Sequence, residues 1–445
     1  MLQITASVMM DRIKTWIGGF RSSTLARNSA WMFMGYGVRI LVQAVYFILI
    51  ARALGPHEYG AFVGATALIA IVSPFGGLGA GNLLVKNVAR DRSLFPVYWG
   101  NALFVLAVSG LALLGGVVFV AHWILPRSIP TLLIVLICLS DLIAARLNDI
   151  AAQAFQAMEQ LGYTANFSLL PNLLRMISAT IVFAVWHRAS AMVWGWFYLG
   201  STVFSCAVCV AITNWKLGVP KLHLSRIPAE MWEGVYFVAG LSAQTVYNDI
   251  DKTMLASLST LDAAGIYAAA YRVIDVAFTP VRSVLYAAYS NFFRSGQHGI
   301  ATSYAFAKRL LPRMVGYGAL AFAGLYLTGP LFPLIIGKDF ARTVEALRWL
   351  ALLPLIKTVH CFLADSLTGA GYQGLRAAAQ ISIALFNVGL NFWLIPAYSW
   401  RGAAWASLAS DGALAMAMYL LLRIIIRRPE LTTGLESDEA YATTD

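Results

Sequence analysis

Charged residues are scarce in this sequence. Asp, Glu, Lys and Arg together make up 12% of its 445 residues, whereas hydrophobic residues make up 59%. Soluble domains contain about 25% charged residues, so the composition excludes an ordinary soluble enzyme. The mean hydropathy is +0.70 over the whole chain, and a helix needs about 20 apolar residues to cross a bilayer. The sequence therefore predicts an all-α, polytopic membrane protein.

Cysteine is also scarce, with four residues in the chain. Cys138, Cys206, Cys209 and Cys361 all lie within apolar runs. The spacing of Cys206 and Cys209 occurs in zinc and redox sites, but no second pair and no histidine cluster completes a four-ligand zinc site. We therefore expect no metal ion and no bound cofactor.

Long polar segments between the apolar runs are absent, so no connection is long enough for a folded catalytic domain. The apolar runs predict about twelve spans, in two six-helix lobes around a central cavity. The predicted spans are residues 29–50, 59–81, 98–121, 130–154, 163–186, 192–213, 233–258, 263–290, 310–337, 346–370, 375–396 and 402–426.

A basic linker divides these spans into two groups of six. It covers residues 214–232 and contains Pro220 and Pro228. The predicted organisation is a basic cytoplasmic tail (1–28), an N-terminal lobe (29–213), the cytoplasmic linker (214–232), a C-terminal lobe (233–428) and an acidic cytoplasmic tail (429–445).

Basic residues outnumber acidic residues by 32 to 21, which gives a formal net charge of +11. Outside the predicted spans, most Lys and Arg residues fall on the side of the membrane that carries both termini. The positive-inside rule then places both termini in the cytoplasm. Because this excess of positive charge reports orientation, we expect membrane lipids rather than nucleic acid as partners.

Some charged residues fall inside the predicted spans. Each one costs about 2.5–3.5 kcal/mol at the membrane centre, so these side chains are expected to line a hydrated cavity rather than to face lipid. The bases are Arg39, Arg146, Arg175, Lys252, Arg272, Arg282 and Lys357, and the acids are Asp141, Asp149, Asp249, Asp251, Asp275, Asp365 and Asp411.

Sequence spacing divides the bases into two groups. Three have acids close by on the same helix, which predicts local pairs: Arg146 with Asp149, Arg272 with Asp275, and Lys252 with Asp249 and Asp251. These pairs either hold helices together or take part in binding, and the spacing leaves both roles open.

The other four bases, Arg39, Arg175, Arg282 and Lys357, have no acid within four positions and are predicted to be unpaired. An unpaired guanidinium at low dielectric favours a carboxylate or a phosphate. We therefore expect an anionic substrate, bound chiefly by these four bases. The three bases with nearby acids are further candidates for substrate binding.

One glycine-rich run, Gly76–Gly81, superficially resembles a phosphate-binding loop. No Gly-Lys-Ser/Thr sequence follows it, and it has no strand–helix context. Bending or close packing of a membrane helix explains these glycines.

Several short segments spread over nearly the whole chain form a recognisable pattern. They are Arg52–Phe62, Leu78–Gly79, Lys86–Arg90, Asp251–Lys252, Gly265–Tyr267, Ala270–Arg272, Gly369–Gly371, Asn387, Asn391, Leu394–Pro396 and Gly402–Ser407. In these segments the chain resembles the O-antigen-type polysaccharide flippases of the multidrug/oligosaccharidyl-lipid/polysaccharide (MOP) exporter superfamily.

The resemblance implies a transporter rather than an enzyme, acting in O-antigen, lipopolysaccharide or exopolysaccharide biosynthesis. The implied substrate is an undecaprenyl-diphosphate-linked glycan, moved by alternating access from the inner to the outer leaflet of the bacterial cytoplasmic (inner) membrane. A polysaccharide polymerase and a chain-length regulator are the implied protein partners. An H⁺ or Na⁺ gradient is the implied driving force, and the candidate ion-coupling residues are Asp141, Asp149, Asp249, Asp275 and Asp365.

Two other functions stay open at this point. A drug/cation antiporter of the same superfamily is favoured if acids rather than bases dominate the cavity. A glycan polymerase or ligase also has many spans, but it normally needs a sizeable external loop.

Overall fold

The computed structural model describes residues 24–186, 188–224 and 248–427, with side chains from residue 41 onward. These ranges contain helices and no strand, which confirms the predicted all-α class. The first half contains α2 (Thr24–Val72), α3 (Ala80–Val88), α4 (Phe95–Ile124), α5 (Thr131–Cys138), α6 (Ala145–Ala157), α7 (Leu161–Val185) and α8 (Ala191–Leu217).

The second half begins with a helical segment at residues 248–258. It continues with α10 (Leu261–Gly296), α11 (Ile300–Thr328), α12 (Phe332–Ile336), α13 (Thr343–Leu350), α14 (Leu353–Gly369), α15 (Gln373–Tyr398) and α16 (Trp400–Arg427). Short turns of 3-10 helix lie between some of these helices: η1 (Ser73–Phe75), η2 (Arg92–Leu94), η5 (Gly329–Leu331) and η6 (Lys338–Phe340).

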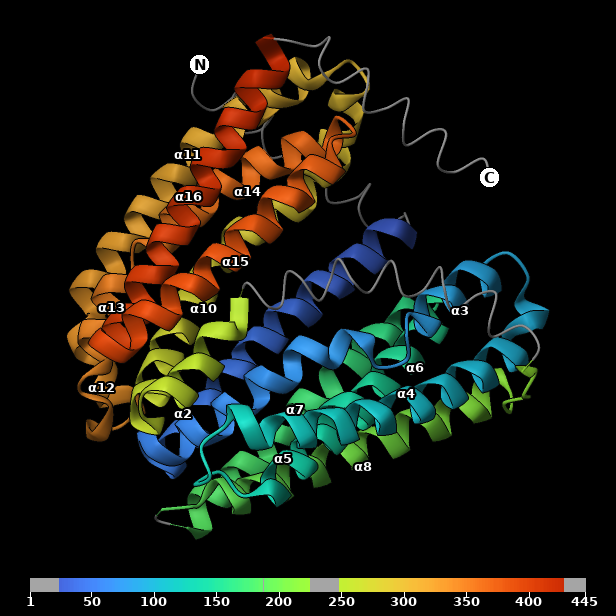
Figure 1. The fold of residues 1–445 in the computed structure, drawn as a ribbon. Coiled ribbons are helices and arrows are strands. Elements are labelled where there is room, and N and C mark those ends of the chain that lie inside the picture. The colour runs from blue at the N-terminus through green and yellow to red at the C-terminus, as the bar shows by residue number, and fades with distance from the viewer. Residues whose placement is uncertain (1–23, 187, 225–247, 428–445) are drawn as a thin grey trace, which may run out of the picture.

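The helices form two arms arranged as a V (Figure 1). One arm contains α2–α8 and the other contains α10–α16. The arms meet where α2 packs along α10, and we call this the closed end. They diverge toward the open end, where α3 and the last turns of α16 lie.

Helix α2 is bent, and this bend joins two predicted spans. Gly55 has φ 71° and ψ 174° inside the helix, and Pro56 follows it. A positive φ favours glycine, and proline cannot donate the helical hydrogen bond at its position. Residues 29–50 and the start of the predicted span 59–81 are therefore the two parts of one kinked helix. The second part ends at Val72, earlier than predicted, because Pro74 and the glycine-rich turn follow.

Nine helices in the described part of the chain are long and apolar enough to cross a membrane. One of them, Leu41–Phe75, covers two of the predicted spans, and α10 has 36 residues without being among the nine. The total of twelve therefore stays a prediction. So do the domain limits, because most of the tail 1–28, the tail 429–445, residues 225–232 of the linker and most of span 233–258 lie outside the described residues.

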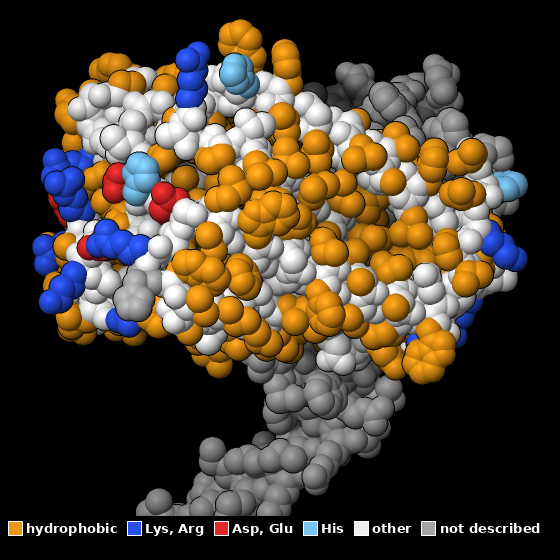
Figure 2. Space-filling model, turned by 90° about the horizontal axis from the view of Figure 1, so that it is seen from below, with side chains coloured by type: hydrophobic (Ala, Val, Ile, Leu, Met, Phe, Trp, Pro, Cys, Tyr) orange, Lys and Arg blue, Asp and Glu red, His pale blue; other side chains and the backbone are white. Residues whose placement is uncertain are grey.

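Hydrophobic side chains cover the middle of the face of the molecule that is seen from below in Figure 2. Figure 2 shows a broad hydrophobic area with Lys and Arg near its two ends. Large apolar side chains such as Phe119, Trp123 and Leu327 are exposed, with Trp123 77% accessible. An exposed apolar area of this extent is expected to contact lipid.

Candidate functional site

The closed end is formed by direct backbone contact between α2 and α10. A Cβ atom added at Gly60 would collide with the carbonyl oxygen of Leu261, and one added at Gly265 would collide with that of Pro56. The two glycines face each other across the contact. Glycine is required at both positions because a side chain there would separate the two arms.

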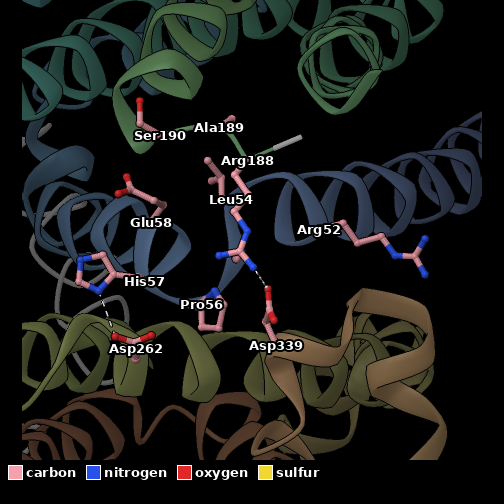
Figure 3. Close-up of a pocket in the computed structure, with 11 residues that line it drawn as sticks. Arg52, Leu54, Pro56, His57, Glu58, Arg188, Ala189, Ser190, Asp262 and Asp339 are labelled. Carbon is pink, nitrogen blue, oxygen red and sulfur yellow. Dashed lines mark hydrogen bonds and ion pairs between the residues drawn. The ribbon is translucent and has the colours of Figure 1, made fainter. Parts of the chain in front are cut away.

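A pocket of about 650 Å³ lies beside this contact (Figure 3). We call it the junction pocket. It is lined by Arg52, Leu54, Gly55, Pro56, His57, Glu58, Arg188, Ala189, Ser190, Asp262 and Asp339. Both arms contribute to this lining, so the pocket lies at the boundary between them.

Polar contacts cross the junction pocket from one arm to the other. His57 Nδ1 lies 3.0 Å from Asp262 Oδ2, and Arg188 lies 3.4 Å from Asp339. Arg52 points away from these pairs in Figure 3, and its guanidinium donates to the carbonyl of Leu334 at 2.6 Å. The segment Arg52–Phe62, which carries part of the resemblance to polysaccharide flippases, therefore joins the two arms.

Glu58 supports this junction from the first arm. Its carboxylate accepts a hydrogen bond from the backbone N–H of Ala191 at 2.6 Å, at the start of α8. Ser190 caps the same helix by accepting from the N–H of Val193. A carboxylate at a helix N-terminus is stabilised by the unpaired N–H groups and by the helix dipole.

We expect Glu58→Ala to lower the free energy of unfolding by about 1 kcal/mol, because a capping acceptor is lost. Glu58→Gln keeps an acceptor oxygen, so its free energy of unfolding should fall by less. Thermal unfolding of the detergent-solubilised chain measures both variants. Equal stability of Glu58→Ala and the parent chain would show that the cap contributes nothing.

The first arm contains a partly buried ion pair. Arg175 on α7 lies 3.4 Å from Asp141, and the two side chains are 19% and 21% exposed. Asp141 also accepts from the Tyr198 hydroxyl at 2.9 Å, and the Arg175 guanidinium lies 4.1 Å from the centre of the Tyr198 ring. The prediction that Arg175 is unpaired is therefore wrong, because its partner comes from another helix.

Asp141 lies in a π-helical segment, η3 (Leu139–Ala144), between α5 and α6. Such segments are rare and occur frequently at functional sites. Arg175 Nε is buried and has no hydrogen-bond partner. The pair is thus held by several contacts and still leaves one donor unused.

Arg146 and Asp149 form the predicted i,i+3 pair on α6. Their side chains approach to 3.3 Å, and Arg146 also donates twice to the hydroxyl of Ser73, at 2.8 and 3.1 Å. This prediction is confirmed. Arg39 is also in a helix, α2, but its side chain lies outside the described residues.

The segment 248–258 confirms one predicted pair and corrects another. The ammonium of Lys252 pairs with Asp249, as predicted. The carboxylate of Asp251 instead accepts from the hydroxyl of Tyr267 and from the backbone N–H of Lys252. Successive residues on a helix point in different directions, which is why Asp251 does not reach the neighbouring ammonium.

On α10, Asp275 pairs with Arg282 at 3.0 Å rather than with Arg272. Arg282 is therefore not unpaired, contrary to the prediction. Residues seven positions apart lie on the same helix face, and the long Arg282 side chain bridges the two turns. Arg272 has no hydrogen-bond or ion-pair partner among the described residues.

Lys357 lies on α14, and no carboxylate within the described residues lies at ion-pair distance from its ammonium group, so its role as an anion-binding base stays a prediction. Its side chain is buried and donates to the hydroxyl of Tyr271 at 2.5 Å. The ammonium groups of Lys252 and Lys357 lie 4.6 and 4.8 Å from the centre of the Tyr271 ring. Two cations thus share one aromatic ring in the second arm.

Sequence reasoning also missed ion pairs between helices of the second arm. Arg376 binds Asp365 at 3.0 Å, and His360 Nε2 lies 3.0 Å from Asp411. The partners come from different helices, so helical spacing carries no signal for them. Within the described ranges, no cluster of three or more His, Cys, Asp or Glu side chains forms a metal site.

Solved structures with this arrangement of helices define the class of fold. An inward-facing multidrug resistance MATE family transporter of the MOP superfamily gives a TM-score of 0.69 at 14% identity, covering 88% of this chain and 96% of its own. The lipid II flippase MurJ, in an inward closed conformation, gives 0.66 at 12% identity, covering 93% of each chain. An outward-facing MATE family transporter gives 0.60 at 15% identity, covering 91% and 96%. This chain therefore has the fold of the MOP superfamily transporters.

A comparison of the sequence with a family model identifies the family of this chain. A family model described as "Polysaccharide biosynthesis protein" matches residues 25–289, which is more than half of the chain. The chain belongs to this family. No curated protein gives a significant sequence match.

Proposed function

We propose that this protein is a flippase for a polyprenyl-diphosphate-linked oligosaccharide. It moves the lipid-linked glycan from the inner to the outer leaflet of the bacterial cytoplasmic membrane by alternating access between its two arms. The family match and the fold shared with MurJ and MATE transporters support a transporter of this type. The polymerase and chain-length regulator of the same glycan are its proposed partners.

One observation carries the substrate assignment. Arg272 lies on α10 and Lys357 on α14, and neither has a carboxylate at ion-pair distance among the described residues. A cation without a directly bound carboxylate at low dielectric is stabilised by an anion, and phosphate oxygens are suitable acceptors for both side chains. A diphosphate is therefore the group that these residues are proposed to bind.

The paired arginines suggest how substrate binding is coupled to an ion gradient. Arg175 and Arg282 are held by Asp141 and Asp275 in this structure. A diphosphate that attracts either arginine leaves its aspartate free to take up H⁺ or Na⁺. Asp149, Asp249 and Asp365 are also paired with bases and are proposed to act in the same way.

The same pairing argues against a drug/cation antiporter. Asp141, Asp249, Asp275 and Asp365 all have basic partners. An acid that is already neutralised attracts a cationic drug weakly. The acids therefore do not dominate the charged interior, as an antiporter for cations would require.

The orientation follows from the predicted cytoplasmic termini. Helix α16 ends at the open end of the V. The open end is therefore proposed to face the cytoplasm, where the lipid-linked glycan is loaded, and the junction pocket is proposed to face the opposite side.

We expect Arg272→Ala and Lys357→Ala each to reduce glycan export about tenfold or more, because a hydrogen bond to a charged group contributes about 1.5–3 kcal/mol. Export is measured as surface glycan in cells and as translocation of lipid-linked glycan in proteoliposomes. Arg90→Ala is the matched control, since Arg90 is exposed and lies between α3 and η2.

Normal export in both variants would rule out the proposed diphosphate site. Drug efflux is measured in the same cells. Efflux that depends on the aspartates, together with glycan export that is insensitive to every base tested, would favour the antiporter instead.

A further inference from the structure

A second pocket lies in the first arm, near the open end, where α3 begins. Its volume is about 300 Å³, and we call it the glycine-loop pocket. It is lined by Pro74, Gly76, Gly77, Gly79, Ala80, Gly81, Asn82, Arg146, Asp149, Ile150, Ala152, Gln153, Gln156, Thr164 and Ser168. The lining combines peptide backbone, carboxamides, hydroxyls and one ion pair.

The carboxamides of this pocket have unused hydrogen-bonding groups. Gln153 Nε2 lies 3.4 Å from Asn82 Oδ1, at the long limit of a hydrogen bond. Among the described residues, Asn82 Nδ2, Gln153 Oε1 and both polar atoms of Gln156 have no other partner. A carboxamide carries both donors and an acceptor. The pocket therefore presents unpaired donors and acceptors side by side.

The charged groups of the pocket are already satisfied. Arg146 is bound by Asp149 and by the hydroxyl of Ser73. Its positive charge is therefore compensated within the protein, unlike the charge of Arg272 in the other arm. A pocket with compensated charge and free amide groups suits a neutral polar ligand better than a phosphate.

The glycine-rich turn fixes the position of the central carboxamide. Gly77, Leu78 and Gly79 have φ values of 80°, 44° and 76°, so the chain turns sharply and approaches α6. A Cβ atom added at Gly81 would collide with Oε1 of Gln153. Glycine at this position lets the backbone lie directly against the Gln153 side chain, which restricts its orientation.

Polar side chains of the pocket are also accessible from outside the molecule. Asp149 is 62% exposed although α6 belongs to a segment that is long and apolar enough to span a membrane, Thr131–Ala157. Gln156 and Ser168 are exposed beside it. Because such groups are costly in lipid, this side of the arm contacts water or a polar ligand.

We infer that the glycine-loop pocket binds a neutral sugar ring of the lipid-linked glycan, through the carboxamides of Asn82, Gln153 and Gln156. Hydroxyl groups of a sugar both donate and accept hydrogen bonds, which matches the mixed groups left free here. The inference rests on the proposed function, since it assigns the sugar to this pocket and the diphosphate to the bases of the other arm.

Two lipid probes separate these assignments. One is a polyprenyl diphosphate without a sugar, and the other is the same lipid with one N-acetylhexosamine. Binding of both is measured with the full-length chain in detergent. We expect the sugar-bearing probe to bind the parent chain about tenfold more tightly, which corresponds to one or two net hydrogen bonds.

In the double variant Gln153→Ala/Gln156→Ala, we expect the two probes to bind with equal affinity. Binding of the bare diphosphate should be unchanged, which also shows that the variant is folded. The matched control is Gln160→Ala. Gln160 precedes α7, lies outside the pocket lining and makes no capping bond with its side chain, so this variant should keep the tenfold difference.

A tenfold difference that persists in the double variant would overturn the sugar site and leave the flippase proposal standing. Equal binding of both probes to the parent chain would overturn it too. If neither probe binds the parent chain, the proposed function itself fails. Failure of the sugar site and failure of the proposed function therefore give different results.

Discussion

Replacement of Gly265 by valine is expected to abolish most glycan export. A side chain at this position collides with the carbonyl oxygen of Pro56 and approaches the backbone of Gly60. Overpacking of a tight contact costs about 1–3 kcal/mol. If this cost falls only on the conformation in which α2 and α10 are in contact, the population of that conformation drops by about 5–150-fold.

The change in population is measured by labelling Ala189→Cys with a membrane-impermeant maleimide, in a chain whose native cysteines are replaced. Ala189 lines the junction pocket and is 2% exposed. Gly265→Val should increase its labelling and decrease export together. Gly316→Val is the control, because nothing lies within 4 Å of a Cβ added at Gly316. Unchanged labelling and full export in Gly265→Val would show that the glycine contact does not control closure.

Asp141→Ala is expected to be the most destabilising change to a charged residue of the first arm. It leaves Arg175, 19% exposed, without its carboxylate partner. Removal of one member of a buried ion pair costs about 3–5 kcal/mol, and the partial exposure of this pair places the expected loss near the lower value. The measurement is thermal or denaturant unfolding of the purified chain in detergent.

The double variant Asp141→Ala/Arg175→Ala tests the cause. It should recover much of the lost stability, because no uncompensated charge then remains. Asp339→Ala is the exposed control. Asp339 and its partner Arg188 are 57% and 84% exposed, so this change should cost less than about 1 kcal/mol. A double variant as unstable as Asp141→Ala would show that lost packing rather than charge is responsible.

The sequence predicts the pairs that depend on a single helical turn. Arg146–Asp149 and Lys252–Asp249 are three positions apart and form as expected. Arg282 and Asp275 are seven positions apart and therefore lie on the same helix face. Their pair was not predicted because only acids within four positions of a base were considered. The helical class and most spans follow from composition and apolar run length in the same direct way.

The pairs between helices could not be predicted. Arg175 and Asp141 are 34 positions apart, His360 and Asp411 are 51 apart, and His57 and Asp262 are 205 apart. Which helices pack together, and with which faces, decides these contacts. Neither the choice of helix partner nor the choice of face is encoded in the periodicity of one segment.

The position of the segment Arg52–Phe62 has a consequence for reading related sequences. This segment carries much of the resemblance to polysaccharide flippases, yet its Arg52, His57 and Glu58 join the arms at the closed end. Similarity there reports how the two arms are joined and carries no information about the substrate. Exchange of the segment between transporters of different glycans should therefore leave each glycan preference as it was.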